Sequence, residues 1–151
     1  MKKNCFTTWQ AYEMGELLAQ SIFELSKTFP LEERFSLTDQ IRRSSRSVCS
    51  NLAESHAKRR YPKHFIAKLT DALGENNETL AWLRFARRCK YIDNTVYLKH
   101  AGENDKIGRL LSYILKFPHK FGANTSSQFP APYPCPRCFF FFTRGLKFPG
   151  L

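Results

Sequence analysis

Apolar residues recur every three or four positions through most of the first 118 residues, the spacing that places them on one face of an α-helix. The first run comprises Ala11, Met14, Leu18, Ile22, Leu25 and Phe29. Thr8 precedes it as a candidate N-cap, and Pro30 ends it. The second run comprises Leu37, Ile41, Ser45, Val48 and Leu52. These spacings predict two amphipathic helices on either side of Pro30.

Two further runs follow the same spacing. The third begins after Tyr61, where Pro62 suits the first turn of a helix, and it comprises Phe65, Ile66, Leu69, Leu73, Asn76, Leu80 and Leu83. The fourth begins near Asp93 and comprises Tyr97, Ala101, Ile107, Leu111, Ile114 and Leu115. No stretch alternates between apolar and polar residues with a period of two, so strands are not expected. The sequence predicts an all-α fold, an up-down-up-down four-helix bundle.

The composition changes sharply at Pro118. The last 33 residues contain five prolines, seven phenylalanines and no acidic residue. Proline at this density excludes a helix interior, because it lacks an amide hydrogen and clashes with the preceding turn. We therefore expect residues 1–118 to form the bundle and residues 119–151 to form an extended or disordered, Pro/Phe-rich tail.

Charge is the unusual property of this chain of 151 residues. The formal net charge is +11, and an excess of this size favours a polyanionic partner such as nucleic acid or an acidic membrane surface. No apolar run is long enough to span a bilayer, and none resembles a signal peptide. Five cysteines, an odd number, do not resemble the disulfide framework of a secreted protein. We expect a cytoplasmic protein with reduced thiols that does not act at a membrane.

Lysine and arginine residues crowd the predicted second and third helices, outside their apolar stripes. At about 100° per residue, Arg42, Arg43 and Arg46 fall largely away from the stripe of the second helix. The candidate nucleic-acid-binding residues are Arg42, Arg43, Arg46, Lys58, Arg59, Arg60, Lys63, Arg84, Arg87, Arg88 and Lys90. In an antiparallel pair, the arginines of the third helix would approach those at the start of the second, and a phosphate backbone would offset their repulsion.

A second interpretation of these cations requires no ligand. Cations near a helix C-terminus are stabilised by the helix dipole, which applies to residues 58–60 and 87–90. Glu54, Glu75 and Glu78 could also pair with arginines inside the chain. No aromatic stacking platform or base-reading motif is evident, so any nucleic-acid binding is expected to rely on backbone and shape.

Several aromatic residues of the first and third helices lie off the main apolar stripes. They are Trp9, Tyr12, Phe23, Trp82 and Phe85. A helix that is apolar on two sides is central to a core or takes part in an oligomer interface. We predict an interface at these residues, with a broader core as the alternative.

Motifs for catalysis or for metal binding are weak. Cys135 and Cys138 have C-x2-C spacing, but a structural zinc site needs four ligands, and only His119 and a remote cysteine could complete it. The histidines form no E-x-x-H pair of the kind found in di-iron bundles. There is no phosphate-binding glycine loop and no nucleophile–base motif. We expect no enzymatic activity, no metal and no cofactor.

The segments Leu37–Arg43 (LTDQIRR) and Ser47–Glu54 (SVCSNLAE) resemble the core signature of the four-helix-bundle proteins of the 23S rRNA intervening-sequence family. Shorter similar pieces occur in the same order: Trp9–Tyr12, Lys27–Pro30, Glu32–Phe35, Ala72–Glu75 with Glu78, and Tyr91-Ile92. The resemblance covers roughly residues 6–117. Cys49 and Ser55 depart from it, since the family usually has proline and glycine at these positions. The tail has no counterpart.

The resemblance implies a bacterial protein that forms an up-down bundle and assembles as a ring-shaped homopentamer. Close relatives are accessory proteins of diversity-generating retroelements, in which a basic pentamer partners a reverse transcriptase and nucleic acid. No catalytic residues are implied. The signature polar residues Arg42, Asn51, Glu54 and Glu78 are expected to form a structural network between helices. A buried glutamate without a cation would be strongly disfavoured, so loss of Arg42 is expected to destabilise the fold.

These observations predict a non-enzymatic protein that binds nucleic acid, RNA favoured, through an arginine-rich surface of a homo-oligomer. The alternative is an oligomeric assembly scaffold that recruits a protein partner such as a reverse transcriptase. The two functions differ in their response to salt, because binding to a phosphate backbone weakens steeply as salt rises.

Overall fold

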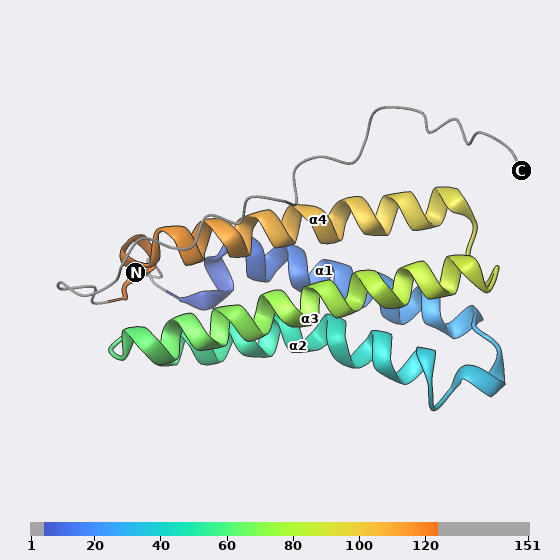
Figure 1. The fold of residues 1–151 in the computed structure, drawn as a ribbon, viewed down its shortest axis with the longest axis horizontal. Coiled ribbons are helices and arrows are strands. Elements are labelled where there is room, and N and C mark those ends of the chain that lie inside the picture. Colours follow the sequence, from blue (N-terminus) through green and yellow to red (C-terminus); the bar gives the residue numbers. More distant parts are fainter. Residues whose placement is uncertain (1–4, 124–151) are drawn as a thin grey trace, which may run out of the picture.

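Four α-helices run alternately up and down along one long axis (Figure 1). They are α1 (Gln10–Leu25), α2 (Leu37–Ala57), α3 (Pro62–Arg88) and α4 (Asn94–Lys116). Short 3-10 helices flank them: η1 (Phe6–Thr8), η2 (Ser26–Thr28), η3 (Leu31–Glu33) and η4 (Pro118–Phe121). The structure is a computed structural model that describes residues 5–123, and no strand occurs within that range.

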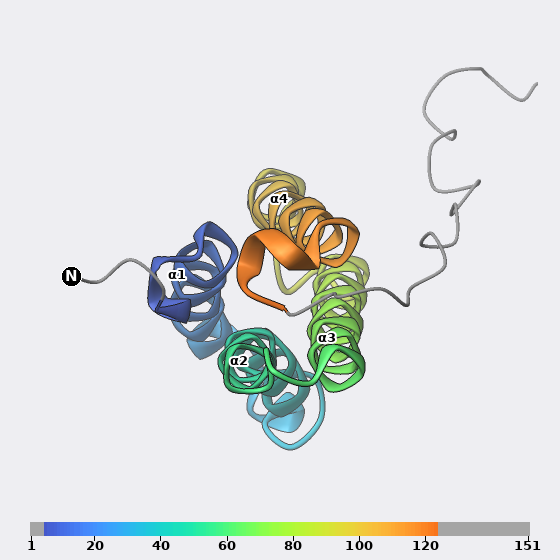
Figure 2. The same ribbon diagram turned by 90° about the vertical axis from the view of Figure 1, so that its left-hand side faces the viewer.

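Viewed from one end, the helices occupy the four corners of a bundle in chain order (Figure 2). α2 packs against α1 and α3, and α4 packs against α3 and α1. Each helix therefore contacts the helix before or after it in an antiparallel sense, which confirms the predicted up-down-up-down four-helix bundle.

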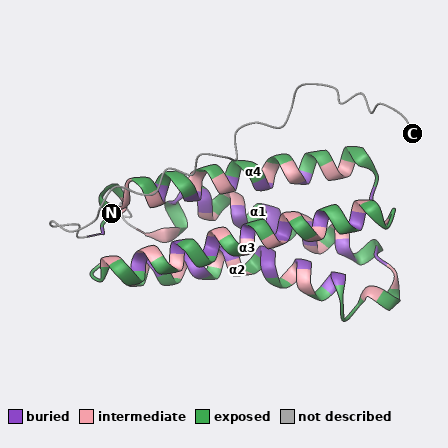
Figure 3. Ribbon diagram, viewed as in Figure 1, coloured by how far each residue is buried: buried purple, intermediate pink, exposed green. Residues whose placement is uncertain are grey.

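The buried residues form a stripe along the inner face of each helix (Figure 3). The large apolar side chains that are almost completely buried are Ile22, Ile41, Leu52, Phe65, Leu69, Leu83, Ile107 and Leu111. All eight belong to the predicted runs. The fourth run differs from its prediction, because Tyr97 and Ala101 are only partly buried while His100 and Asn104 are buried. The core of the bundle thus contains polar side chains beside α4.

Two helix ends differ from the predictions. α1 ends at Leu25, and η2 carries the chain on so that Phe29 is still buried. Thr8 is not the N-cap of α1: that position is Trp9, and the Thr8 hydroxyl donates to the Cys5 carbonyl at 2.8 Å. Asp93, in contrast, caps α4 as its position suggests, because its Oδ1 accepts from the Val96 amide at 2.7 Å.

The folded domain continues past the predicted boundary at Pro118. After η4 the chain packs back on the bundle, with the rings of Phe121 and Trp9 5.5 Å apart and Ala123 buried. Gly122 has φ +85°, a left-handed conformation that glycine adopts without steric cost. The domain therefore includes residues 119–123, and the rest of the predicted tail lies outside the described residues.

Membrane-spanning helices and clusters of metal-ligating side chains were sought in the described part of the chain. None of its helices is long and apolar enough to cross a bilayer. Nor do three or more His, Cys, Asp or Glu side chains of residues 5–123 come together in a group that could hold a metal. Cys135 and Cys138 lie outside this range.

Candidate nucleic-acid interface

The predicted cations lie on separate surfaces of the bundle. Arg42 and Arg46 reach from α2 to Phe23 of α1, whereas Arg87 contacts α4, and Arg84 and Arg88 lie on the outer face of α3. Residues 58–63 surround the turn between α2 and α3, at the opposite end of the bundle from the turn between α3 and α4 (Figure 1). Arg42 and Arg46 thus turn towards α1 and Arg87 turns towards α4, so these three arginines do not form one cluster. The approach of Arg43 to Arg84 and Arg88, at the end of the bundle where α2 begins and α3 ends, stays a prediction.

Three cations converge on one aromatic ring between α1 and α2. Lys27 Nζ lies 4.7 Å from the centroid of Phe23, Arg42 Cζ lies 4.9 Å from it, and Arg46 Cζ lies 5.4 Å from it. Arg42 Nε also donates to Ser26 Oγ at 2.6 Å. We call Lys27, Arg42, Arg46 and Phe23 the Phe23 cluster. The i,i+4 spacing of Phe23 with Lys27, and of Arg42 with Arg46, brings the four side chains together.

The Phe23 cluster carries excess positive charge. Lys27 pairs with Glu24 at 2.7 Å, but no carboxylate among residues 5–123 forms an ion pair with Arg42 or Arg46. Each cation over a ring contributes about 0.5–1 kcal/mol at an exposed site, which helps to hold the like charges together. Glu16 lines a neighbouring groove with Arg46 and moderates the local potential. The cluster thus presents two arginines whose charge is available to an anion.

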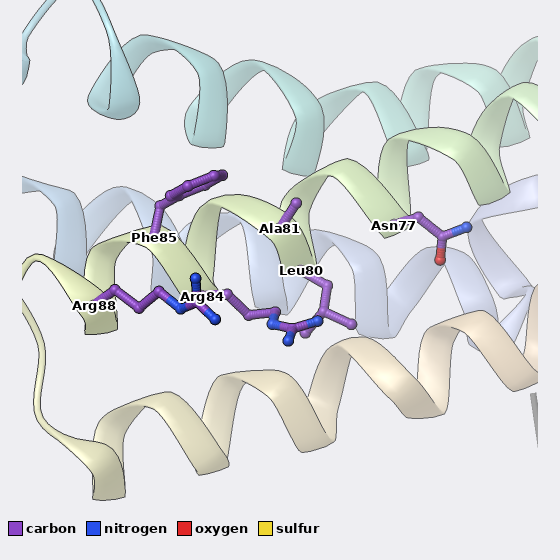
Figure 4. Close-up of a pocket in the computed structure, with 6 residues that line it drawn as sticks. All are labelled: Asn77, Leu80, Ala81, Arg84, Phe85 and Arg88. Carbon is purple, nitrogen blue, oxygen red and sulfur yellow. The ribbon is translucent and has the colours of Figure 1, made fainter. Parts of the chain in front are cut away.

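A second cationic surface lies on the outer face of α3 (Figure 4). A shallow groove of about 270 Å³ is lined by Asn77, Leu80, Ala81, Arg84, Phe85 and Arg88, and we call it the α3 groove. Phe85 is 51% exposed. The sequence predicts that Phe85 lies in an oligomer interface, and it shows no evident aromatic stacking platform. The signal that this prediction missed is that Ala81, Arg84, Phe85 and Arg88 share the face of α3 opposite its buried stripe.

Arg87 and Lys90 make contacts within the chain at the end of α3. The Arg87 guanidinium carbon lies 4.3 Å from the centroid of Tyr97, and Nη1 donates to Asn94 Oδ1 at 3.2 Å. Lys90 has φ +63° just after α3, where its amide donates to the Arg87 carbonyl at 3.0 Å. These two residues help to end α3 and to join it to α4, so they are weaker candidates for a ligand.

The remaining predicted cations differ in exposure. Lys58 and Arg59 are half-buried, and Arg59 Nε donates to the His56 carbonyl at 2.8 Å. Arg60 and Lys63 are exposed near the α2–α3 turn. Arg43 is exposed and donates to Gln40.

The predicted network of four polar residues does not form. Arg42 bonds to Ser26, and Glu78 Oε1 accepts from Trp82 Nε1 at 3.0 Å. Asn51 and Glu54 are linked through Lys68, whose Nζ lies 3.3 Å from Asn51 Oδ1 and 2.9 Å from Glu54 Oε2.

Glu54 is exposed, which contradicts the expectation that it is buried. The hydrogen bond from Lys68 and that residue's charge hold the pKa of Glu54 below its usual value. The loss of Arg42 would therefore leave no buried glutamate unpaired, and the reason for expecting it to unfold the protein no longer applies.

Most of the predicted interface aromatics are used within the chain. Trp9 is 8% exposed and packs against Phe65 and Phe121, so it belongs to the core and that part of the interface prediction is wrong. Tyr12 is half-buried beside Phe6, and Phe23 lies among its three cations. Trp82 is half-buried as well. Only Phe85, of these five, is classed as exposed.

The chain is similar to known proteins over its helical part. A family model described as 23S rRNA-intervening sequence protein matches residues 7–113. A crystal structure of a protein of unknown function from the S23 ribosomal protein family of Bacteroides thetaiotaomicron is 32% identical, with a TM-score of 0.64. That match covers 70% of this chain and 95% of the other. No curated protein matches the chain. The residues of the Phe23 cluster lie within the range that the family model covers.

Proposed function

The chain belongs to the family of 23S rRNA-intervening sequence proteins, and we propose that it binds nucleic acid, with RNA favoured, and catalyses no reaction. The observation that carries this proposal is the Phe23 cluster. Arg42 and Arg46 converge there without an ion-paired carboxylate among the described residues, in a chain of net charge +11.

The chemistry of the cluster suits phosphate. A guanidinium presents several N–H donors in a planar fork that matches the oxygens of a phosphate. Two such groups one helical turn apart can contact neighbouring phosphates of one strand, with Lys27 as a third charge. Phosphate contacts carry no sequence information, so this surface supports recognition of backbone and shape.

The test is binding of the purified chain to a structured RNA and to a duplex DNA, side by side, at low and high salt. The proposal expects tight binding at low salt that weakens steeply as salt rises, because each phosphate contact releases counterions. RNA should bind at least as tightly as DNA. Absence of binding to either nucleic acid at low salt, with the protein folded, would refute the proposal.

A second candidate function rests on exposed apolar side chains. Leu31 is 85% exposed and Phe35 is 86% exposed, beside the start of α2. Such residues favour a contact with protein, and the alternative is an assembly scaffold that recruits a partner such as a reverse transcriptase. The affinity for a partner bound through apolar surface would change little with salt concentration, whereas the affinity for a phosphate backbone would fall steeply as salt rises.

Self-association is part of the same proposal. We expect a homo-oligomer, a homopentamer by the family resemblance, which would multiply the number of Phe23 clusters that face one ligand. Light scattering of the purified protein measures the molar mass directly. A molar mass equal to that of one chain across the working concentrations would exclude the oligomer. Nucleic acid would then bind to a single Phe23 cluster on a monomer.

A further inference from the structure

The α3 groove differs from the Phe23 cluster because its aromatic ring is open to solvent. Phe85 is 51% exposed, whereas Phe23 lies among three cations. Arg84 and Arg88 line the same groove, and within residues 5–123 neither forms an ion pair with a carboxylate. The groove therefore combines an accessible aromatic face with two positive charges.

The ring of Phe85 is supported from within the bundle. Its centroid lies 5.8 Å from that of Trp82, at an interplanar angle of 42°. Trp82 is itself fixed, because its Nε1 donates to Glu78 Oε1 at 3.0 Å. A ring that is already held in place loses little conformational freedom when a ligand stacks on it, which favours binding.

The shape of the groove limits what it can hold. Phe85 projects from the α2 side of α3, while the side chains of Arg84 and Arg88 extend along its α4 side, and the small Ala81 lies next to Phe85 along the helix (Figure 4). Asn77 lies at the far end and offers an amide donor and an acceptor. A volume of about 270 Å³ is below the roughly 300–1,000 Å³ typical of small-molecule pockets. An open groove of this size suits one or two nucleotides of a longer strand.

We propose that the α3 groove binds an unpaired nucleotide of a single-stranded segment, an inference that rests on the proposed function. The base stacks on Phe85, and the adjacent phosphates lie against Arg84 and Arg88. Stacking on an aromatic side chain accepts any base, because every base has a π-face. The bases of a duplex are stacked on one another and cannot reach the ring. The groove therefore gives the protein a preference for unpaired over paired segments.

The test compares a short unstructured RNA with an RNA duplex of the same length, by fluorescence anisotropy on the full chain. Phe85→Leu keeps the apolar volume but removes the aromatic face. It should weaken single-strand binding about fivefold or more, toward the lower end of what base stacking contributes, and leave duplex binding nearly unchanged. Phe85→Tyr retains the aromatic ring and should bind single-stranded RNA with an affinity close to that of the wild type. Phe35→Leu, which alters an 86% exposed ring elsewhere, should leave both affinities unchanged.

The arginines are tested separately. Arg84→Gln with Arg88→Gln should reduce the log–log salt slope for single-stranded RNA by about 1.4, which corresponds to two phosphate contacts. An unchanged slope would refute the phosphate role of these two residues.

Three results would overturn the inference. Equal weakening of single-strand and duplex binding by Phe85→Leu, or weakening of neither, would show that no base stacks on the ring, while the proposed function would stand. A changed molar mass of Phe85→Leu in light scattering, without a selective loss of single-strand affinity, would make the groove a contact between copies of the chain. Wild-type protein that binds neither RNA at low salt would refute the inference and the proposed function together.

Discussion

Asn76 of α3 and Asn104 of α4 hydrogen-bond to each other's backbone. Asn76 Nδ2 donates to the Asn104 carbonyl at 3.2 Å, and Asn104 Nδ2 donates to the Asn76 carbonyl at 3.1 Å. Both side chains are buried, and neither Oδ1 has a hydrogen-bond partner in the described structure. Because each bond forms at only one relative position of the helices, this reciprocal pair fixes the register of α3 against α4.

Gly108 provides a test of this pair. A Cβ at Gly108 would lie 3.1 Å from Asn76 Nδ2, whereas a Cβ at Gly102, on the same helix, would meet nothing within 4 Å. Gly102→Ala should stabilise the protein by roughly 0.5–1 kcal/mol, the usual helix-propensity gain. Gly108→Ala should displace the Asn76 amide and destabilise the protein by about 1 kcal/mol despite the same gain.

The free energy of unfolding in urea measures both variants. Opposite signs are expected for two identical substitutions on one helix. Equal stabilisation by the two alanines would show that the Asn76 amide moves freely and does not fix the register.

Cys49 should make the protein sensitive to alkaline pH. Burial, with the nearby Glu16 carboxylate adding to it, raises the pKa of the Cys49 thiol to about 11. The unfolded thiol ionises near its ordinary pKa of about 8.5, so between about pH 9 and pH 11 the folded state holds a proton that the unfolded state releases. Stability present at neutral pH is therefore lost as the pH rises through this window.

The measurement is urea unfolding under reducing conditions at pH 8 and at about pH 10.5, for wild type and Cys49→Ala. The wild type should lose more stability than the variant over this interval, by on the order of 1 kcal/mol after allowance for solvent screening. The pKa values of Tyr12 and Tyr91 are also raised, and both tyrosines are present in the two proteins. Burial is the main cause of the raised pKa of Tyr12, and the charge of Cys49 adds to it, which acts in the same direction as the expected difference. Parallel losses would contradict the burial of the thiol.

Phe121 should contribute to the stability of the bundle although it lies after the last α-helix. Its ring packs edge-on against Trp9 and lies 6.2 Å from the ring of Tyr113. Phe121→Ala should cost about 2 kcal/mol, less than for a fully buried phenylalanine, and shift the Trp9 fluorescence towards that of an exposed indole.

His119→Ala is the control, because His119 is exposed in the same turn and should change stability by no more than about 0.5 kcal/mol. Thermal unfolding compares the two variants. Equal melting temperatures would show that residues 118–123 are not part of the folded domain.

The spacing of apolar residues was sufficient to predict the architecture. A period of three and four residues places Ile41, Val48 and Leu52 on one face whatever the neighbouring helices are, so the four helices and most core positions follow from the sequence. The buried His100 and Asn104 could not be predicted in this way, because the spacing of apolar residues assigns every polar residue to the exposed face of a helix. Only the hydrogen-bond partners in the folded structure show that these two are buried. For His100 the partners are Ser21 and the Val96 carbonyl, at 2.9 and 2.8 Å.

The candidate site was less predictable than the fold. Sequence projection correctly places Arg42 and Arg46 away from the main stripe of α2, but it does not tell which neighbouring helix a long side chain contacts. The Phe23 cluster depends on that choice, since Phe23 belongs to α1 and the arginines belong to α2. The same uncertainty explains the false prediction of a network between Arg42 and Glu78, two residues whose partners in the structure are Ser26 and Trp82.

The role of the Phe23 cluster is tested most directly by the salt dependence of structured-RNA binding for two charge-matched variants. Arg42→Gln with Arg46→Gln removes two charges from the Phe23 cluster, and Lys106→Gln with Arg109→Gln removes two exposed charges from α4. We expect the first pair to reduce the log–log slope by about 1.4–1.8 and the second pair to leave it nearly unchanged. Equal reductions in the two variants would mean that net charge alone governs binding, and would contradict a specific site at the Phe23 cluster.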